Sequence, residues 1–276
     1  MTVSTTRETM PDVQSRGDTR QITIQKVGVR RVRYPFTIQI DGQAQPTVAD
    51  WELTVALPAE EKGTHMSRFI ALLEEHRHRP VDLAAYCQMA VHMLELLDAR
   101  QGEIQAEFPI FINKVAPISK VNSLLDYRVR WIVQANAEQA QPIEALTVQV
   151  TVPVTSLCPC SKEISQYGAH NQRSHVIVDM HLDPESLATF NLTELISGIE
   201  AQGSCQLWGL LKRTDEKYVT EHAYENPKFV EDLVRDVAVY LNGVQGVQAY
   251  RIEAENFESI HNHSAYAVVV SQAESS

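Results

Sequence analysis

Two cysteines and a histidine lie close together in one polar stretch of the chain. Cys158 and Cys160 flank a single proline, and His170 follows in the same stretch. A thiolate and an imidazole are ligands that Zn²⁺ prefers in proteins. The stretch separates two predicted strands, so we expect a loop that presents its side chains from a rigid scaffold. These residues indicate a metal site; the alternative is a reduced cysteine pair beside a surface histidine.

A carboxylate farther along the chain suits the recognition of a purine base. Glu231 falls in the first two turns of a predicted helix whose apolar residues recur at helical spacing. The helix dipole favours a carboxylate there, which explains Glu231 without any function. Alternatively, Glu231 accepts hydrogen bonds from the N1–H and exocyclic amine of a guanine. The preceding charged stretch, 212–217, is interpreted mainly as solvated charge.

Glu258 and His261 lie in the predicted connection before the last strand. A carboxylate beside an imidazole can set its tautomer and raise its basicity, so these residues suit proton transfer. A polar turn without a chemical role is the alternative interpretation.

A group of donors surrounds the start of a predicted helix near residue 64. Lys62, His65, Ser67 and Arg68 gather there, and a helix N-terminus favours anions such as phosphate. A solvated surface is again the alternative. The sequence contains neither a Walker loop nor a Gly-x-Gly-x-x-Gly turn, so a nucleotide would not be held by those devices.

Composition limits the class of protein. The chain has 276 residues and a formal net charge of -11, which argues against a nucleic-acid-binding surface. No apolar run approaches the roughly 18 residues that cross a bilayer, so no membrane partner is expected. Residues 1–20 are polar without a signal-peptide core and are expected to be a flexible leader. Four cysteines with one closely spaced pair favour a reducing, cytoplasmic compartment.

Hydrophobic periodicity predicts the element order ββααββ twice. Alternating runs favour strands, and apolar residues at helical spacing favour helices. This pattern indicates an α+β protein with a first module over residues 21–140 and a second over 141–276. Open sheet edges would need a partner, which favours a closed oligomer. The expected elements are 22–29, 34–40, 50–57, 64–76 (helix), 81–100 (helix), 106–114, 126–135, 144–155, 175–182, 192–201 (helix), 227–241 (helix, capped by Asn226), 248–255 and 264–270.

The charged and polar clusters, in this order, resemble the prokaryotic type IB GTP cyclohydrolases. The resemblance covers nearly the whole chain after the leader. Its matching strings are Leu57-Pro58 with Lys62-Gly63-Thr64-His65-Met66-Ser67-Arg68-Phe69, Ser156-Leu157-Cys158-Pro159-Cys160-Ser161-Lys162, Gly168-Ala169-His170-Asn171-Gln172-Arg173, Lys212 to Glu221, Asn226-Pro227-Lys228-Phe229-Val230-Glu231-Asp232 and Glu258-Ser259-Ile260-His261.

The resemblance implies a tunnelling fold, with two tandem ββααββ modules whose helices cover one face and whose sheets close into a barrel in a homotetramer. It implies a single divalent ion held by Cys158, His170 and Glu216, and no organic cofactor. Ligands of this type do not distinguish Zn²⁺, Mn²⁺ and Fe²⁺. Cys160 would lie near the ion without binding it.

The resemblance also implies the reaction and the remaining roles. GTP and water would give 7,8-dihydroneopterin triphosphate and formate, the first step of tetrahydrofolate biosynthesis, by attack of a metal-activated water at purine C8. Cys158, Glu258 and His261 would be catalytic, and Glu231 would bind the guanine. The triphosphate would contact Lys62, His65, Ser67 and Arg68, which either the same subunit or a neighbouring one would supply. Lys162 and Arg173 are weaker candidates for the same role.

Three alternatives remain at this stage. A tunnelling-fold nitrile reductase of queuosine synthesis would use Cys158 as a covalent nucleophile and need NADPH. A close relative would stop at a cyclic phosphate. A third alternative is an oligomer that holds metal without catalysis. His170 and Glu216 beside Cys158 disfavour the nucleophile, because a nucleophile needs no such ligand set.

Overall fold

The computed structural model describes residues 17–271. Most of the expected leader, residues 1–16, therefore lies outside the described residues. Within the described part, Gly17 forms an isolated β-bridge with Glu61. None of the described helices is both long and apolar enough to cross a membrane.

One nine-stranded sheet runs through the described residues in the order β3-β1-β2-β4-β5-β6-β7-β8-β9. All neighbouring strands are antiparallel except β1 and β3, which are parallel. The strands are β1 (Ile24–Ile40), β2 (Gln43–Leu57), β3 (Pro80–Val81), β4 (Gln101–Val115), β5 (Asn122–Asn136), β6 (Ile143–Leu157), β7 (Asn171–Leu182), β8 (Val247–Asn256) and β9 (Ala265–Val270).

The alternation that predicted the strands also sets which face is buried. Ala106 pairs with Trp131, Trp131 with Val148, Val148 with Met180 and Met180 with Tyr250 across five adjacent strands. All five side chains are buried in one continuous core. Because side chains alternate between faces along a strand, this register gives the sheet one apolar face and one mixed, more polar face.

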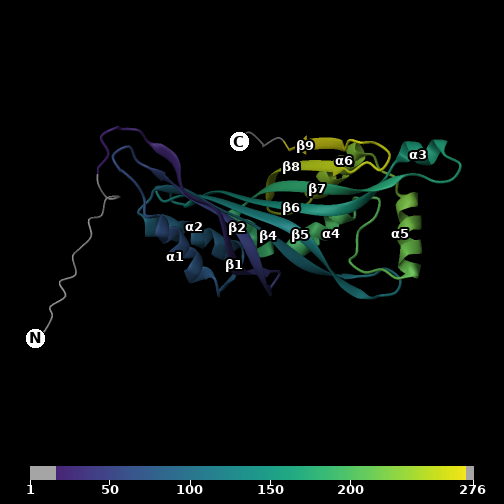
Figure 1. Ribbon diagram of the computed structural model, residues 1–276, viewed down its shortest axis with the longest axis horizontal. Helices are drawn as coiled ribbons and strands as arrows, with labels where there is room; N and C mark the ends of the chain where they lie inside the picture. The colour runs from purple at the N-terminus through teal and green to yellow at the C-terminus, as the bar shows by residue number, and fades with distance from the viewer. Residues whose placement is uncertain (1–16, 272–276) are drawn as a thin grey trace, which may run out of the picture.

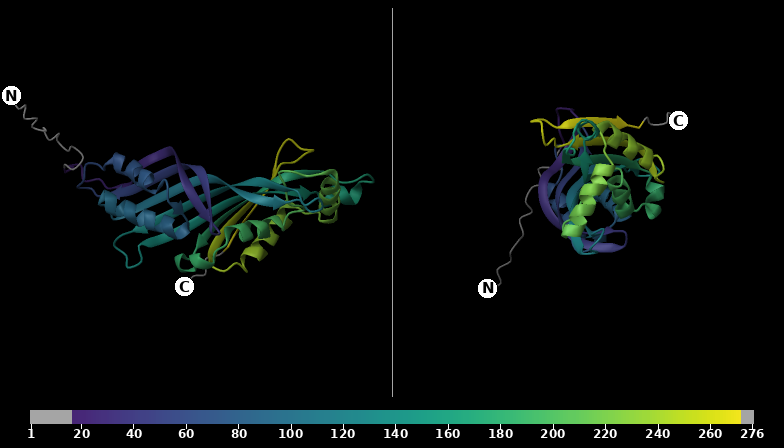
Figure 2. Two further views of the ribbon diagram at one scale, coloured as in Figure 1. Left: turned by 90° about the horizontal axis from the view of Figure 1, so that it is seen from below. Right: turned by 90° about the vertical axis from the view of Figure 1, so that its right-hand side faces the viewer.

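The helices pack on the apolar face and at one end of the sheet (Figure 1). Helices α1 and α2 cover the first half, and α4 and α6 cover the second, while α3 and α5 stand at the far end (Figure 2). The helices are α1 (Met66–His76), α2 (Leu83–Leu97), α3 (Pro159–Ile164), α4 (Leu192–Glu200), α5 (Arg213–Glu225) and α6 (Val230–Leu241), with a 3₁₀ helix η1 (Pro184–Thr189). The predicted α+β class is confirmed.

Several element boundaries differ from the expectation. The range 34–40 and most of 22–29 belong to the single strand β1, which begins at Ile24 and whose register shifts near Arg31, a residue with φ of 60°. The charged stretch 212–217 leads into a helix that the sequence did not predict, α5; its side chains are exposed except that of Asp215, which is buried. Asn226 ends α5 rather than starting the next helix. Helix α6 begins at Val230, where Asp232 accepts a hydrogen bond from the Phe229 amide (3.1 Å).

A buried polar cluster joins the two halves of the chain. Glu200 of α4 pairs with Lys114 of β4 (Nζ to Oε2, 2.5 Å) and accepts a hydrogen bond from the Tyr127 hydroxyl (2.6 Å). Lys114 also donates to Gln206 (3.1 Å). A buried charge is stable only when it is paired and hydrogen-bonded, so these contacts fix where α4 leads into the segment before α5.

Candidate metal centre and substrate site

The segment from Cys158 to His170 is a compact hydrogen-bonded loop. Cys158 caps α3, and its Sγ accepts a hydrogen bond from the Ser161 amide (3.5 Å). Its own amide donates to the His170 carbonyl (3.1 Å), and the His170 amide donates to the Ser161 hydroxyl (3.2 Å). The two predicted ligands are therefore brought to the same end of the β6–β7 pair. The thiol and the imidazole are both half-buried.

A chain of buried polar side chains orients the His170 ring. The Gln172 amide nitrogen donates to the Ser156 hydroxyl (2.7 Å), so its oxygen faces His170 Nδ1 (3.0 Å). Ser174 joins the same network through Ser156 and Asn256 (2.8 and 2.7 Å). An Nδ1–H that donates to an oxygen leaves Nε2 with a lone pair for a metal ion.

Glu258 lies beside this imidazole. Its Oε2 is 3.8 Å from His170 Nδ1. The same oxygen is buried and has no hydrogen-bond partner among the described residues. A carboxyl group in that position needs either a positive charge nearby or a proton of its own. His261, which was expected to pair with Glu258, is exposed and stacks on His263 instead, with ring centroids 5.0 Å apart.

Helix α5 lies across the end of the loop. Ala223 is buried against Leu157 and Cys205, and Val219 and Ala169 pack around them. Because Glu216 precedes Val219 and Ala223 at helical spacing, it lies on the same face of α5. Its side chain is nevertheless exposed.

Asp215 anchors α5 to the turn between β4 and β5. Its carboxylate accepts hydrogen bonds from the amides of Ile118, Ser119 and Lys212 (each 2.8 Å) and from the Ser119 hydroxyl. Burial raises the pKa of Asp215, but the hydrogen bonds from Ser119, Lys212 and Ile118 outweigh it and hold the pKa well below its usual range. An ionised Asp215 therefore fixes where Glu216 sits.

Glu231 is also near this end of the sheet. The Lys228 amide donates to the Leu157 carbonyl (3.0 Å), directly before Cys158. Glu231 follows in the first turn of α6 with an exposed side chain. Lys162 of α3 donates to the Tyr224 carbonyl and lies over the Tyr224 ring at 4.4 Å, so it joins α3 to α5. The Arg173 side chain is exposed.

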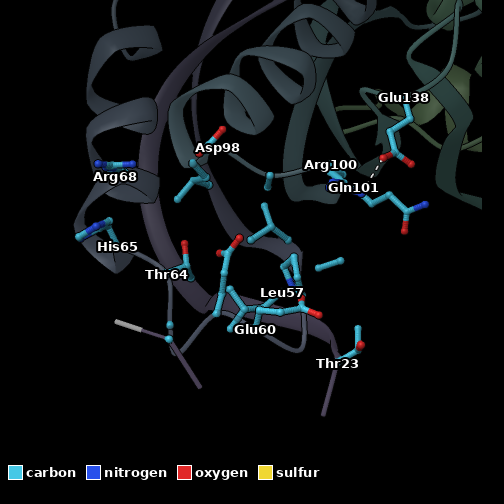
Figure 3. Close-up of a pocket in the computed structure, with 18 residues that line it drawn as sticks. Thr23, Leu57, Glu60, Thr64, His65, Arg68, Asp98, Arg100, Gln101 and Glu138 are labelled. Atoms are coloured by element: carbon cyan, nitrogen blue, oxygen red, sulfur yellow. Dashed lines mark hydrogen bonds and ion pairs between the residues drawn. The ribbon is translucent and has the colours of Figure 1, made fainter. Parts of the chain in front are cut away.

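The predicted triphosphate residues lie in a different part of the chain. His65 and Arg68 line a cavity of about 700 Å³ at the start of α1 (Figure 3). Arg68 also donates to the Leu96 carbonyl at the end of α2 (3.0 Å). Lys62 and Ser67 are exposed nearby. Figures 1 and 2 show α1 at the opposite end of the molecule from α3 and α5.

The most closely spaced metal-ligating side chains lie away from the Cys158–His170 loop. In the described part of the chain, the only group of His, Cys, Asp and Glu ligand atoms that all lie within 4.8 Å of one another is Glu75, His76 and His92. Cys158, His170 and Glu216 are therefore not gathered that closely.

Sequence reasoning missed the residues that support the loop. Ser156, Gln172, Ser174 and Asn256 are buried polar side chains at inward positions of strands. Polar residues in the inward phase of otherwise apolar alternation are the signal that could have identified them. Asp215 was missed because most of its donors, from Ile118 and Ser119, lie in a turn distant in sequence, and only the Lys212 amide is local.

The chain matches the family model described as type I GTP cyclohydrolase folE2 over residues 10–267. It is 62% identical over 261 residues to GTP cyclohydrolase FolE2 of Bordetella pertussis, covering 94% of this chain and 96% of that one. It is 59% identical over 263 residues to the protein of the same name from Paraburkholderia phymatum, covering 95% of each chain.

Solved structures of similar fold share little sequence with this chain. Urate oxidase from Bacillus subtilis 168 has a TM-score of 0.54 at 8% identity, covering 91% of this chain and 100% of its own. Uricase from Arthrobacter globiformis has a TM-score of 0.51 at 9% identity, covering 91% and 94%. These proteins have the tunnelling fold, and the likeness concerns the fold alone.

Proposed function

The chain belongs to the type I GTP cyclohydrolase FolE2 family, and on that premise we propose that it hydrolyses GTP in the first step of folate biosynthesis. Within that family we assign it to the type IB class, with 7,8-dihydroneopterin triphosphate and formate as products. The observation that carries the proposal is the Cys158–His170 loop with the orphaned carboxylate oxygen of Glu258 beside it.

The residues of this loop fit a divalent metal ion. The Cys158 thiol, the His170 imidazole with a free Nε2 and the Glu216 carboxylate are donors of the kinds that bind Zn²⁺, Mn²⁺ or Fe²⁺. We propose Cys158, His170 and Glu216 as the ligands. When bound by these residues, the ion would supply Lewis-acid activation of the water that adds at purine C8.

The other steps depend on this chain's own side chains. Gln172 keeps the His170 ring in one orientation. Glu258 accepts or returns a proton near that ring, and we propose His261 as a second proton carrier once the connection between β8 and β9 closes over substrate. Glu231, at the start of α6, would accept hydrogen bonds from the guanine, which orients C8 toward the loop.

We further propose that each complete site contains residues of two subunits. Helix α1, at whose start the donors Lys62, His65, Ser67 and Arg68 lie, is at the opposite end of the molecule from α3, which Cys158 caps (Figure 1). One chain therefore cannot bring both groups to one GTP molecule without a large rearrangement. Assembly into a homotetramer, with sheets closed side by side into a barrel, would satisfy the open edge β9 and juxtapose the two groups. Residues 21–140 and 141–276 would be its two modules.

Product analysis tests the proposed reaction. Purified protein is incubated with GTP and Zn²⁺, Mn²⁺ or Fe²⁺ in turn, and formate and pterin fluorescence are measured. We expect both to appear together. Absence of formate with every ion would refute the proposal. Formate together with a cyclic phosphate would show that the product is the cyclic compound and not 7,8-dihydroneopterin triphosphate.

A further inference from the structure

A second group of metal-ligating side chains lies between α1 and α2, far from the Cys158 loop. Glu75 and His76 occupy the last turn of α1, and His92 faces them from α2. The ligand atoms of all three lie within 4.8 Å of one another. The two imidazole rings meet edge to face, with centroids 5.9 Å apart.

His76 is the most constrained member of this group. Its Nε2 is buried and has no hydrogen-bond partner among the described residues. A buried polar atom without a partner destabilises the folded chain, so a ligand for that nitrogen would remove a penalty. The neighbouring cation Arg77 is engaged by Glu74 (2.9 Å). Arg79 is near enough to act on His76 electrostatically, and it would oppose a bound cation.

We propose that Glu75, His76 and His92 bind a zinc ion that clamps the end of α1 to α2. Two imidazoles and a carboxylate, with water in the fourth position, form a common zinc ligand set. Zinc–ligand bonds of about 2.0–2.2 Å put tetrahedral donors roughly 3.4 Å apart, so the group must contract slightly. The exposed side chain of Glu75 can make that movement.

The clamp has a structural consequence for the other end of α1. The same helix begins beside His65 and carries Ser67 and Arg68 in its first turn. Zinc would fix the packing of α1 on α2 and thereby the presentation of those donors. This inference is independent of the proposed reaction, because it concerns residues that the reaction does not use.

Zinc binding is measured by equilibrium dialysis with metal analysis, on the full chain carrying Cys158→Ala and His170→Ala so that the loop site is removed. We expect about one zinc per chain. Adding His92→Gln should weaken binding by more than about tenfold, since loss of even a supporting partner of a ligand costs 10–100-fold. His78→Gln, which changes an exposed histidine outside the group, should leave binding unchanged.

A second measurement guards against misfolding of the multiply substituted chain. In the otherwise unsubstituted protein, His92→Gln should lower the zinc content by about one ion per chain relative to His78→Gln. Added zinc should raise the melting temperature of the His92→Gln protein less than that of the His78→Gln protein. Equal zinc affinity in the His92 and His78 variants, or no binding in the first background together with equal zinc content in the second, would overturn the proposal.

Discussion

At the scale of single residues, the proposed metal centre depends on how His170 is held. Its ring is oriented by Gln172, which is itself fixed by Ser156. The sequence predicted that Cys158 and His170 converge, because both lie on one short connection. It could not predict the Gln172 network, since that contact requires the register of β6 on β7.

Replacing Gln172 tests this orientation directly. Gln172→Ala should weaken metal affinity by about 10–100-fold, because the partner that fixes the ligand's tautomer is lost. Competition with a chromogenic chelator measures the change, and Asn171→Ala, at an exposed neighbouring position, is the matched control. Equal affinities in the two variants would show that Gln172 does not orient the ligand.

Glu231 tests recognition of the base separately from metal binding. Glu231→Ala should raise KM for GTP by at least about tenfold, as expected for loss of a charge-assisted hydrogen bond of roughly 1.5–3 kcal/mol, and leave metal content unchanged. Glu225→Ala, an exposed carboxylate at the end of α5, serves as control. An unchanged KM would remove Glu231 from the guanine site.

At the scale of elements, the strands were more predictable than the helices around the site. Strand alternation is a local signal, so every expected strand overlaps an observed one. Helix α5 was missed because only Val219 and Ala223 provide its apolar face, within a mostly charged sequence. Its position depends on Asp215 and a distant turn, which no local pattern encodes.

Asp215 should therefore control the stability of the end of the sheet that carries α5. Asp215→Ala leaves four neutral donors without their acceptor, and we expect a loss of more than about 1 kcal/mol in unfolding free energy, because a buried donor without a partner is costly. Urea denaturation measures it, with Thr214→Ala, at an exposed position on α5, as control. A loss below about 1 kcal/mol would contradict the anchoring role.

The low pKa of Asp215 also gives a pH dependence with a definite sign. Because its pKa is lower in the folded than in the unfolded protein, its contribution is complete above the unfolded value of about 4 and is lost as pH falls below it. The difference in stability between the unsubstituted protein and Asp215→Asn should therefore shrink below pH ~4. A difference that stays constant with pH would contradict this account.

At the scale of the whole molecule, the separation of the two proposed substrate groups predicts complementation between subunits. Cys158→Ala and Arg68→Ala chains should each be inactive as pure oligomers. After the two are mixed, dissociated and reassembled, some sites would combine an intact Arg68 with an intact Cys158, so activity should return. Mixing without reassembly is the control. No recovery in verified mixed oligomers would show that the two groups do not share a site.

The whole-molecule arrangement was the least accessible to sequence reasoning. The α+β class followed from element order, but the single continuous sheet depends on β5 pairing with β6, which crosses the expected boundary between the two modules. Residues that resemble one family's binding strings therefore lie at opposite ends of one chain.

The central claim is that hydrolytic opening of the purine ring of GTP depends on a metal ion held by Cys158. The most direct measurement is formate release from GTP, together with bound metal, for Cys158→Ser and Cys160→Ser in parallel. The account predicts that Cys158→Ser loses both formate release and the metal of the loop site, whereas Cys160→Ser keeps both. Formate release by Cys158→Ser at the rate of the unsubstituted protein would contradict it.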